Sequence, residues 1–210
     1  INGLHFKIDD VEISTKLVGG FNIYNILATY SVALELKQDK SKVLPILSNI
    51  DFVSGRFNIV KNSMITAIVD YAHTPDALKK VILSISNFCS TQKNLITVIG
   101  CGGDRDRGKR SIMGKVAAEN SSLSIFTSDN PRFEDPKLII DDMCLDLSEK
   151  LNNKVERIIN REEAIRFAIR NASNESIVLV AGKGHEKFQE INGVKTPFDD
   201  LKILKKHLKI

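Results

Sequence analysis

Residues able to bind an anion gather in one short stretch of the chain, Gly100–Arg110, with the sequence GCGGDRDRGKR. Its three arginines and one lysine supply positive charge for carboxylate or phosphate groups, and its glycines allow close backbone approach. The stretch follows the apolar run Leu95–Ile99, which places it at the edge of a sheet where α/β proteins bind ligands. It matches neither GxxxxGK[ST] nor GxGxxG. It therefore predicts an anion-binding loop without naming the anion, and the alternative is a tight turn with a solvated basic rim.

Polar residues follow three further apolar segments in the same way. With the glycine-rich loop, the four polar segments are Asp70–His73, Gly102–Arg107, Ser128–Arg132 and Gly182–Glu186. Because the carboxyl ends of parallel strands meet at one edge of a sheet, we expect these segments to line a common cleft. Four such segments predict an active-site edge, which a single one would not.

The charges of these segments suit a zwitterion. Arg105 and Arg132 offer planar forks for bidentate carboxylate binding. Asp129, Asn130 and Glu186 can hold an ammonium group. The aspartates that alternate with the arginines of the glycine-rich loop leave a second interpretation open, in which they form surface salt bridges worth only ~0–1 kcal/mol.

Further polar residues could contact a nucleotide or another ligand. Asp70 can accept hydrogen bonds from paired hydroxyls such as those of a ribose, and His73 could donate or stack, although a lone histidine is more often structural. Asn22 and Asn25 form a polar stripe on a predicted helix, which indicates a cap or a side chain that reaches a ligand. The sequence favours Asn22 as the N-cap with Asn25 simply exposed.

Strand and helix patterns alternate over the last 150 residues or so, which predicts an α/β fold with a doubly wound, mostly parallel sheet. The expected strands are Phe57–Val60, Met64–Val69, Leu95–Ile99, Leu123–Thr127, Lys154–Ile158 and Ile177–Ala181. The expected helices begin at Pro75, Ser111, Asp135, Asn160 and Asp199, and the one from Asp135 runs to about Lys150.

The first fifty residues have a different pattern. Leu4–Ile8 and Val11–Leu17 alternate as in a β-hairpin, and Phe21–Lys37 has helical periodicity. A second short helix is expected over Lys42–Asn49. We place a domain boundary near residue 53, which gives domains 1–53 and 54–210.

Composition narrows the classes of partner. The net charge of +4 comes from 30 basic and 26 acidic residues that are interleaved, so it gives no argument for nucleic acid. No apolar run approaches the ~18 residues of a membrane span, and no signal-peptide pattern is present. Cys89, Cys101 and Cys144 are widely spaced, which favours free thiols in a reducing, cytoplasmic setting. A start at Ile1 without a methionine favours a fragment, and we expect a monomer.

Six motifs together resemble the Mur ligase family. They are Gly20–Asn25, Ser54–Arg56, Val69–Asp76, Gly100–Arg110, Thr127–Arg132 and Ala181–Glu186. The resemblance is greatest to the members that add the third residue of the peptidoglycan stem peptide. It implies the end of the family's central ATPase domain in 1–53, followed by its complete Rossmann-like C-terminal domain in 54–210.

The resemblance also implies a reaction and its residues. Such enzymes use ATP and Mg²⁺ to phosphorylate the D-glutamate carboxylate of UDP-N-acetylmuramoyl-L-alanyl-D-glutamate, and the incoming amino group attacks the acyl phosphate. By likeness, Asn25, Arg56, Asp70 and His73 contact the nucleotide. The residues that match the amino-acid site are Arg105, Asp129, Asn130, Pro131, Arg132, Gly182 and Glu186. The family's GKT loop, Mg²⁺ ligands and modified lysine are expected upstream of Ile1, so we expect the chain alone to be inactive.

The sequence DNPR at Asp129–Arg132 resembles the form associated with meso-diaminopimelate rather than L-lysine. Diaminopimelate carries a second carboxylate that an arginine would pair with, whereas lysine would bring an ammonium group against it. Two other interpretations stay open, namely a ligase for L-lysine or another diamino acid, and a stand-alone module that binds an amino acid without chemistry.

Overall fold

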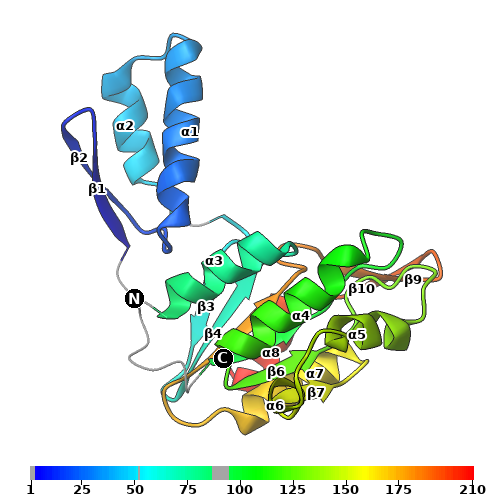
Figure 1. Ribbon diagram of the computed structural model, residues 1–210. Coiled ribbons are helices and arrows are strands. Elements are labelled where there is room, and N and C mark those ends of the chain that lie inside the picture. The colour runs from blue at the N-terminus through cyan, green and yellow to red at the C-terminus, as the bar shows by residue number, and fades with distance from the viewer. Residues whose placement is uncertain (1–2, 52, 87–94) are drawn as a thin grey trace. The chain divides into compact units, whose positions relative to one another are not determined.

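The computed structural model describes residues 3–51, 53–86 and 95–210. The chain divides into two compact units, Ile1–Val53 and Ser54–Ile210, coloured blue and cyan to red in Figure 1. Because the candidate cleft residues all come from the second unit except Asn25, the two units are described separately.

The first unit is a hairpin packed on two helices. Strands β1 (Leu4–Ile8) and β2 (Val11–Thr15) pair antiparallel, and α1 (Phe21–Glu35) and α2 (Lys40–Ser48) follow. The turn residues Asp9 and Asp10 both have positive φ, as a two-residue type I′ turn requires. The core of this unit consists of Ile8, Ile13, Leu17, Ile26, Tyr30, Leu44 and Leu47.

The N-terminus of α1 differs from the sequence prediction. The helix begins after Gly20, which makes no side-chain cap. Asn22 is buried inside the first turn and donates from Nδ2 to the carbonyl of Val18 at 2.7 Å. Asn25 is exposed and donates to Oδ1 of Asn22 at 3.0 Å. The prediction that Asn22 is the N-cap was therefore wrong, because its amide satisfies the carbonyl of the preceding turn instead.

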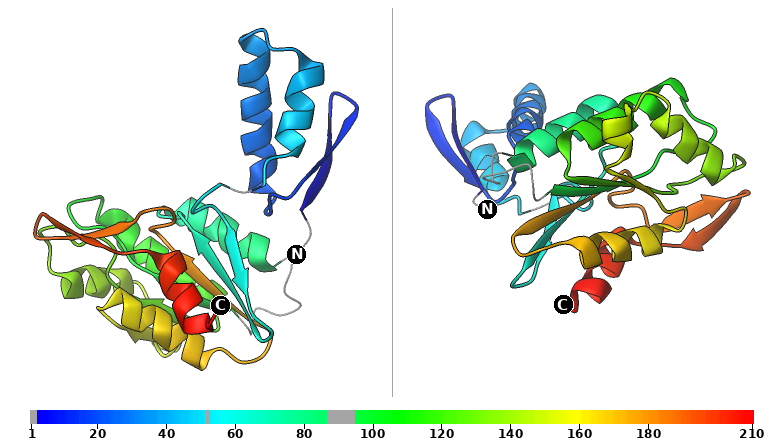
Figure 2. Two further views of the ribbon diagram at one scale, coloured as in Figure 1. Left: turned by 180° about the vertical axis from the view of Figure 1, so that it is seen from behind. Right: turned by 60° about the horizontal axis from the view of Figure 1, so that its bottom comes forward.

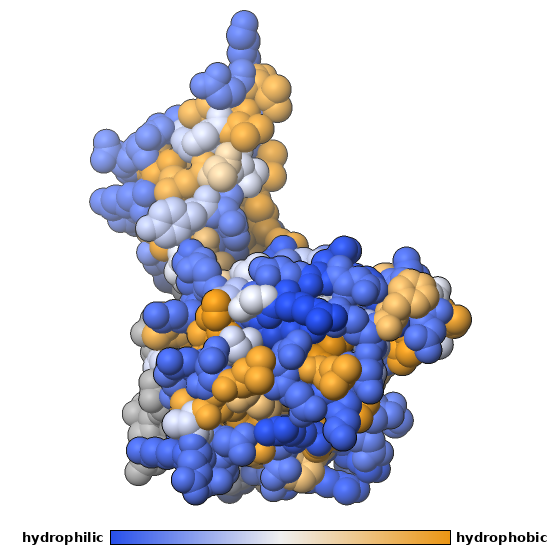
Figure 3. All heavy atoms as spheres, turned by 45° about the vertical axis from the view of Figure 1, so that its right-hand side comes forward, coloured by the Kyte–Doolittle hydropathy of each residue, from blue (hydrophilic) through white to orange (hydrophobic). Residues whose placement is uncertain are grey.

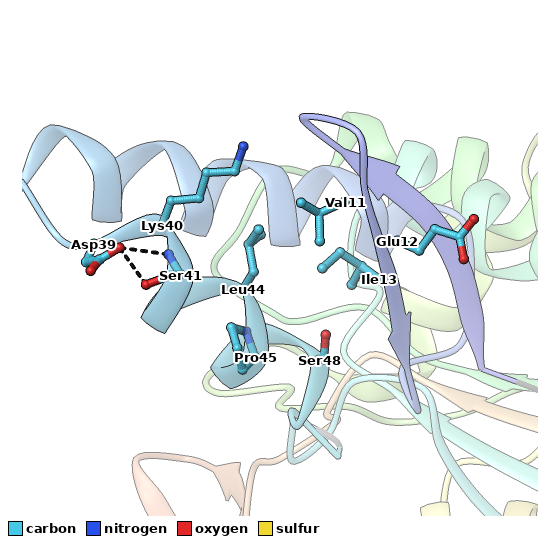
Figure 4. Close-up of a pocket in the computed structure, with 9 residues that line it drawn as sticks. All are labelled: Val11, Glu12, Ile13, Asp39, Lys40, Ser41, Leu44, Pro45 and Ser48. Carbon is cyan, nitrogen blue, oxygen red and sulfur yellow. Dashed lines mark hydrogen bonds between the residues drawn. The ribbon is translucent and has the colours of Figure 1, made fainter.

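A cavity of about 500 Å³ lies within the first unit between β2 and α2 (Figure 4). Val11, Ile13 and Leu44 point toward one another across it, whereas Glu12 points away on the other side of the strand. None of the predicted site residues lines this cavity. Its central side chains are apolar, so it offers little to a charged ligand.

The second unit is built on a six-stranded sheet with the order β3-β4-β8-β5-β6-β7. Only β3 is antiparallel to its neighbour, and the other pairs are parallel. The strands are β3 (Asn58–Lys61), β4 (Ile65–Asp70), β5 (Leu95–Ile99), β6 (Leu123–Phe126), β7 (Val155–Arg157) and β8 (Ser176–Ala181). The predicted α/β fold with a mostly parallel sheet is confirmed.

Helices cover both faces of this sheet. The right-hand view of Figure 2 shows α3, α4 and α5 on one face and α7 and α8 on the other. Their bounds are α3 (Pro75–Ser86), α4 (Gly108–Asn120), α5 (Pro136–Cys144), α7 (Arg161–Asn171) and α8 (Asp200–Leu208). The central strands β5 and β8 are buried along their whole length, as a sheet covered on both faces requires. In Figure 3 the visible surface of the second unit, in the lower part of the picture, is mostly hydrophilic, with smaller hydrophobic patches among polar side chains.

Capping residues explain where two helices begin. Asp135 accepts from the backbone N–H of Lys137 ahead of Pro136, and Asn160 accepts from that of Glu163. The predicted single helix to Lys150 was wrong, because α5 ends at Cys144 and α6 (Glu149–Asn152) starts separately. Ser148 caps α6 by accepting from the N–H of Leu151.

A second hairpin, β9 (Phe188–Ile191) with β10 (Val194–Pro197), projects from the unit between β8 and α8 (Figure 1). The sequence analysis did not predict it. Within the described ranges, no helix combines the length and apolar character that a bilayer crossing needs.

Candidate functional site

The loops that follow β4, β5, β6 and β8 enclose a cavity of about 470 Å³ at the carboxyl edge of the sheet. Its lining residues are Tyr71, His73, Thr74, Gly100, Cys101, Gly102, Arg105, Asp106, Lys109, Asp129, Asn130, Arg132, Gly182 and Glu186. The prediction that the four polar segments share one cleft is confirmed. A parallel sheet brings them together because all four strands point the same way.

Seven of the predicted site residues line this cavity. They are His73, Arg105, Asp129, Asn130, Arg132, Gly182 and Glu186. Arg56, Asp70 and Pro131 belong to the same unit but are not among the lining residues, and Asn25 lies in the first unit. The cavity thus brings together six of the seven residues assigned to the amino acid, all except Pro131, and also His73.

One wall of the cavity carries the groups that can hold an ammonium. Asn130 donates from Nδ2 to Oε2 of Glu186 at 2.9 Å. Behind them, Lys183 is fully buried and donates from Nζ to Oδ1 of Asn130 at 2.8 Å and to Oε2 of Glu186 at 3.1 Å. Sequence reasoning missed Lys183, although it lies inside the Gly182–Glu186 motif, because the pattern does not show which side of the loop a side chain takes.

Asp129 also lines the cavity, at its base, and is only 9% exposed. Its burial raises the pKa of the carboxyl, while the positive charges of Lys183 and Arg161 act in the opposite direction. Gly182 takes φ +111°, and a Cβ there would stand 2.9 Å from Oδ2 of Asp129. A side chain at Gly182 would therefore crowd the carboxylate, so the close approach explains the glycine.

A buried ion pair supports this base from below. Arg161 donates from Nε and Nη2 to the two carboxylate oxygens of Asp200 at 2.9 and 2.8 Å, and both side chains are 0% exposed. Nη2 also donates to the carbonyl of Ala181 at 3.0 Å. The bidentate pair joins α7 to α8 directly beneath the loop that carries Gly182.

Arg132 also lines the cavity and has a left-handed backbone conformation, with φ +52°. Its Nη1 donates to the carbonyl of Gly103 at 2.7 Å, and its Nε lies 3.8 Å from Oε2 of Glu190. Its backbone N–H donates to the carbonyl of Glu190, and its own carbonyl accepts from the N–H of Asn192. Since such a backbone costs about 1 kcal/mol or more for a residue with a Cβ, these bonds to the hairpin hold it in place.

Arg105 is exposed at the cavity and forms no ion pair within the described ranges. The interpretation in which neighbouring aspartates neutralise the arginines of the loop was wrong for this region. Arg107 and Arg110 pair with Glu134, while Asp106 accepts from the backbone N–H of Gly108. Arg105 is therefore left available for a carboxylate.

From its sequence position Arg110 was expected only to add positive charge to the glycine-rich loop, yet its side chain anchors that loop. It is 1% exposed and donates to both oxygens of Glu134, to Asp142 and to the carbonyl of Gly102. The bonds from Arg110 and its positive charge lower the pKa of Glu134 to about 2. The loop that presents Arg105 is thus anchored to α5 by a buried cation.

Two loops of the site contact each other at Pro131 and Gly103. Pro131 is buried, and a Cβ on Gly103 would lie 1.9 Å from its carbonyl oxygen. The N–H of Gly103 donates to the carbonyl of Asn130 at 2.9 Å. Pro131 therefore shapes the site through its backbone, because its ring does not line the cavity.

Of the residues assigned to a nucleotide, Asp70 is buried, whereas Asn25, Arg56 and His73 are exposed. The two carboxylate oxygens of Asp70 accept from the backbone N–H groups of Phe57 and Ala72, both at 2.8 Å. Burial raises the pKa of its carboxyl. Arg56 lies over the ring of Tyr71 at 4.9 Å, and the ring of His73 lies 4.6 Å from that of Tyr71. Contact of Asp70 with a ribose stays a prediction, which its remaining lone pairs allow.

No group of three or more histidine, cysteine, aspartate or glutamate side chains in the described parts of the chain is placed to hold a metal ion.

Comparisons with known proteins identify relatives of this chain. The sequence pattern described as "Mur ligase, glutamate ligase domain" matches residues 55–184. A UDP-N-acetylmuramoyl-L-alanyl-D-glutamate–2,6-diaminopimelate ligase of Cytophaga hutchinsonii is 46% identical over 99% of this chain and 43% of its own length. The ligase of the same name from Oceanobacillus iheyensis is 42% identical over 98% of this chain and 41% of its own length.

A solved structure described by the same ligase name superposes with a TM-score of 0.72 at 37% identity. The superposition covers 95% of this chain and 40% of that one. The chain thus spans about two fifths of the length of the relatives it matches. The cleft is lined by residues of four of the six motifs on which the resemblance rests. Because the family pattern covers more than half of the chain, the chain belongs to the Mur ligase family.

Proposed function

We propose that this chain is the C-terminal part of an ATP-dependent ligase that adds meso-diaminopimelate to UDP-N-acetylmuramoyl-L-alanyl-D-glutamate in peptidoglycan synthesis. One observation carries the proposal. A single cavity holds two arginines, Arg105 and Arg132, together with the carboxylates of Asp129 and Glu186. The names of the relatives support the same substrate.

The arrangement of charges favours diaminopimelate over lysine. Its carboxylates suit the guanidinium groups of Arg105 and Arg132, and an ammonium group suits Asp129 and Glu186. Lysine would leave one arginine without a carboxylate and place an ammonium group near it. A site whose polar groups are left unpaired by the wrong substrate can favour the right one by ~10⁴ or more in kcat/KM.

The reaction forms an amide. In the proposed scheme ATP phosphorylates the D-glutamate carboxylate, the free amino group of diaminopimelate attacks the acyl phosphate, and inorganic phosphate leaves. The residues of this chain bind and orient the amino acid. We assign ATP contacts to Asn25, Arg56, Asp70 and His73, and we assign the phosphate cradle and Mg²⁺ to residues outside this chain.

The proposal extends to the organisation of the whole protein. Residues 1–53 are assigned to the end of the central ATP-binding domain and 54–210 to the C-terminal domain. A cytoplasmic, monomeric enzyme without nucleic-acid partners stays the expectation. Cys101 and Cys144 are free thiols, which is compatible with a reducing compartment.

A ligation assay tests the function. The intact protein that contains this chain is supplied with ATP, Mg²⁺, the UDP-muramoyl dipeptide and equal amounts of meso-diaminopimelate and L-lysine. We expect phosphate release and a product whose mass corresponds to the diaminopimelate adduct. A lysine adduct would support the alternative ligase, and tight binding of diaminopimelate to the 210-residue chain without any ligation would support a binding module.

A further inference from the structure

Lys183 is a buried lysine directly behind the cavity wall that Asn130 and Glu186 form. Its side chain is 0% exposed, and it is not itself among the lining residues. Lysine is almost never fully buried unless it is paired, because the ammonium group loses its hydration. The two bonds described above, to Oδ1 of Asn130 and Oε2 of Glu186, supply that pairing.

These bonds fix which way the Asn130 amide faces. Its Oδ1 accepts from Nζ of Lys183 and from the backbone N–H of Glu190 at 3.0 Å. Its Nδ2 donates to Glu186. A flipped amide would place its NH₂ group against two donors and its oxygen against a carboxylate. Lys183 therefore holds Asn130 and Glu186 in a single arrangement.

Lys183 also sets the charge of the wall. The groups that act on Asp129 are Lys183, Arg161, Glu186 and Asp200. Two cations thus lie near three carboxylates, those of Asp129, Glu186 and Asp200. Arg161 already forms a bidentate ion pair with Asp200. Lys183 is left to offset Asp129 and Glu186 together. When Asp129 and Glu186 are both ionised, the wall has one negative charge in excess, which one ammonium group would neutralise.

We infer that Lys183 is a positioning residue for amino-acid recognition, which orients Asn130 and Glu186 so that the wall accepts a single ammonium group. The identity of the amino acid rests on the function proposed above. Lys183 acts on the substrate only through its two partners. Without Lys183 the carboxylates of Asp129 and Glu186 would repel each other. The Asn130 amide would also lose one of the two donors that orient it.

Steady-state kinetics of the Lys183→Met variant of the intact protein test this role. Methionine has a similar length but neither charge nor donor. We expect the KM for diaminopimelate to rise about 10- to 100-fold, in line with the loss of a charged hydrogen bond, while kcat and the KM for ATP change less than about threefold. Lys187→Met is the matched control, because Lys187 is an exposed neighbour that pairs with Asp199 away from the cavity. It should keep the wild-type KM.

A Lys183→Met variant with the wild-type KM for diaminopimelate, or with an equal rise in the KM for ATP, would overturn the inference. Lys183→Arg decides the matter if the methionine variant does not fold, because it keeps the buried charge. Its planar guanidinium does not reproduce the position of a single ammonium group between Asn130 and Glu186. We expect it to raise the KM for diaminopimelate about tenfold, and a wild-type value would again contradict the role of Lys183.

The failure of the proposed function has a different signature. A wild-type enzyme that ligates L-lysine and not diaminopimelate would overturn the substrate assignment. The same variants would then report on Lys183 through the KM for L-lysine, since that amino acid also presents an ammonium group.

Discussion

At the scale of single residues, Glu134 joins three parts of the second unit outside the cavity. Its carboxylate accepts from Arg110 on α4, from Arg107 and from the backbone N–H of Asp104. Arg110 is 1% exposed and Glu134 13% exposed, so solvent screens their ion pair little. Glu134 thereby holds the loop that presents Arg105.

Glu134→Gln should destabilise the protein in a pH-dependent way. At neutral pH we expect a loss of about 3 kcal/mol in the free energy of unfolding, because a buried arginine loses its charged partner. The folded state lowers the pKa of Glu134 from 4.5 to about 2, so its stabilisation is present above pH 4.5 and is lost as the pH falls toward 2. Thermal unfolding from pH 2 to 7 measures this.

The gap between wild type and variant should therefore close as the pH falls below 4.5. Glu119→Gln is the control, since Glu119 is exposed on the same helix as Arg110. A gap that stays constant over the whole pH range would contradict the assignment of the Glu134 charge.

The sequence indicated the residues that face the cavity better than those that support them. Arg105, Asp129 and Glu186 follow apolar strands, and strand order alone brings such positions to one edge. The supports depend on partners far along the chain, since Lys183 and Asn130 are 53 positions apart and Arg110 and Glu134 are 24 apart. No local pattern contains those distances, so the buried cations could not be assigned.

At the scale of elements, the β9–β10 hairpin acts as a clamp on the loop after β6. Gln189 donates from Nε2 to the carbonyl of Asp129 at 2.8 Å, and the backbone of residues 190–192 bonds to Asn130 and Arg132. Arg132 and Ile191 also form an isolated parallel bridge. The hairpin thus holds the loop that carries three candidate substrate contacts of the cavity, Asp129, Asn130 and Arg132.

Gln189→Ala should loosen this clamp without touching the cavity, because Gln189 is not a lining residue. We expect the KM for diaminopimelate to rise about fivefold, which corresponds to one hydrogen bond of about 1 kcal/mol. Lys195→Ala on the partner strand is the control. Lys195 lies over the ring of Phe188 and, within the part of the chain that the structure describes, forms no hydrogen bond or ion pair with residues 128–132. Equal effects of both substitutions on the KM would count against a clamp.

The sequence did contain a signal for this hairpin. Asn192 and Gly193 have φ of +51° and +75°, as a type I′ turn requires, and Asn-Gly is the preferred pair for it. The four-residue strands around it are largely exposed or half-buried, so no apolar alternation marks them. The break between α5 and α6 was also missed. Ser148 is the N-cap of α6, but the residue types around it favour a helix, so no local pattern marks the break.

At the scale of the whole molecule, the chain consists of two units with separate cores. The core of the second unit includes strand residues such as Val98 and Val180, together with Ile165 of α7 and Leu204 of α8. The core of the first unit is confined to residues before Val53. We propose that the second unit is an independent folding domain.

Residues 54–210 expressed alone should therefore unfold in one cooperative transition. We expect the amide resonances of the cavity loops to match those of the 210-residue chain, because the loops pack against elements of the same unit. Calorimetry and heteronuclear NMR spectra measure both properties. A broad, non-cooperative transition would show that the boundary at residue 53 is misplaced.

The central claim is that the cleft recognises the second carboxylate of diaminopimelate through Arg132. Steady-state kinetics of Arg132→Ala in the intact protein, with meso-diaminopimelate and L-lysine compared, test it most directly. We expect kcat/KM for diaminopimelate to fall about 100-fold or more, as for the loss of a bidentate charged contact, while the KM for ATP and the slow rate with lysine change little. An equal fall for both amino acids, or an equal rise in the KM for ATP, would contradict the account.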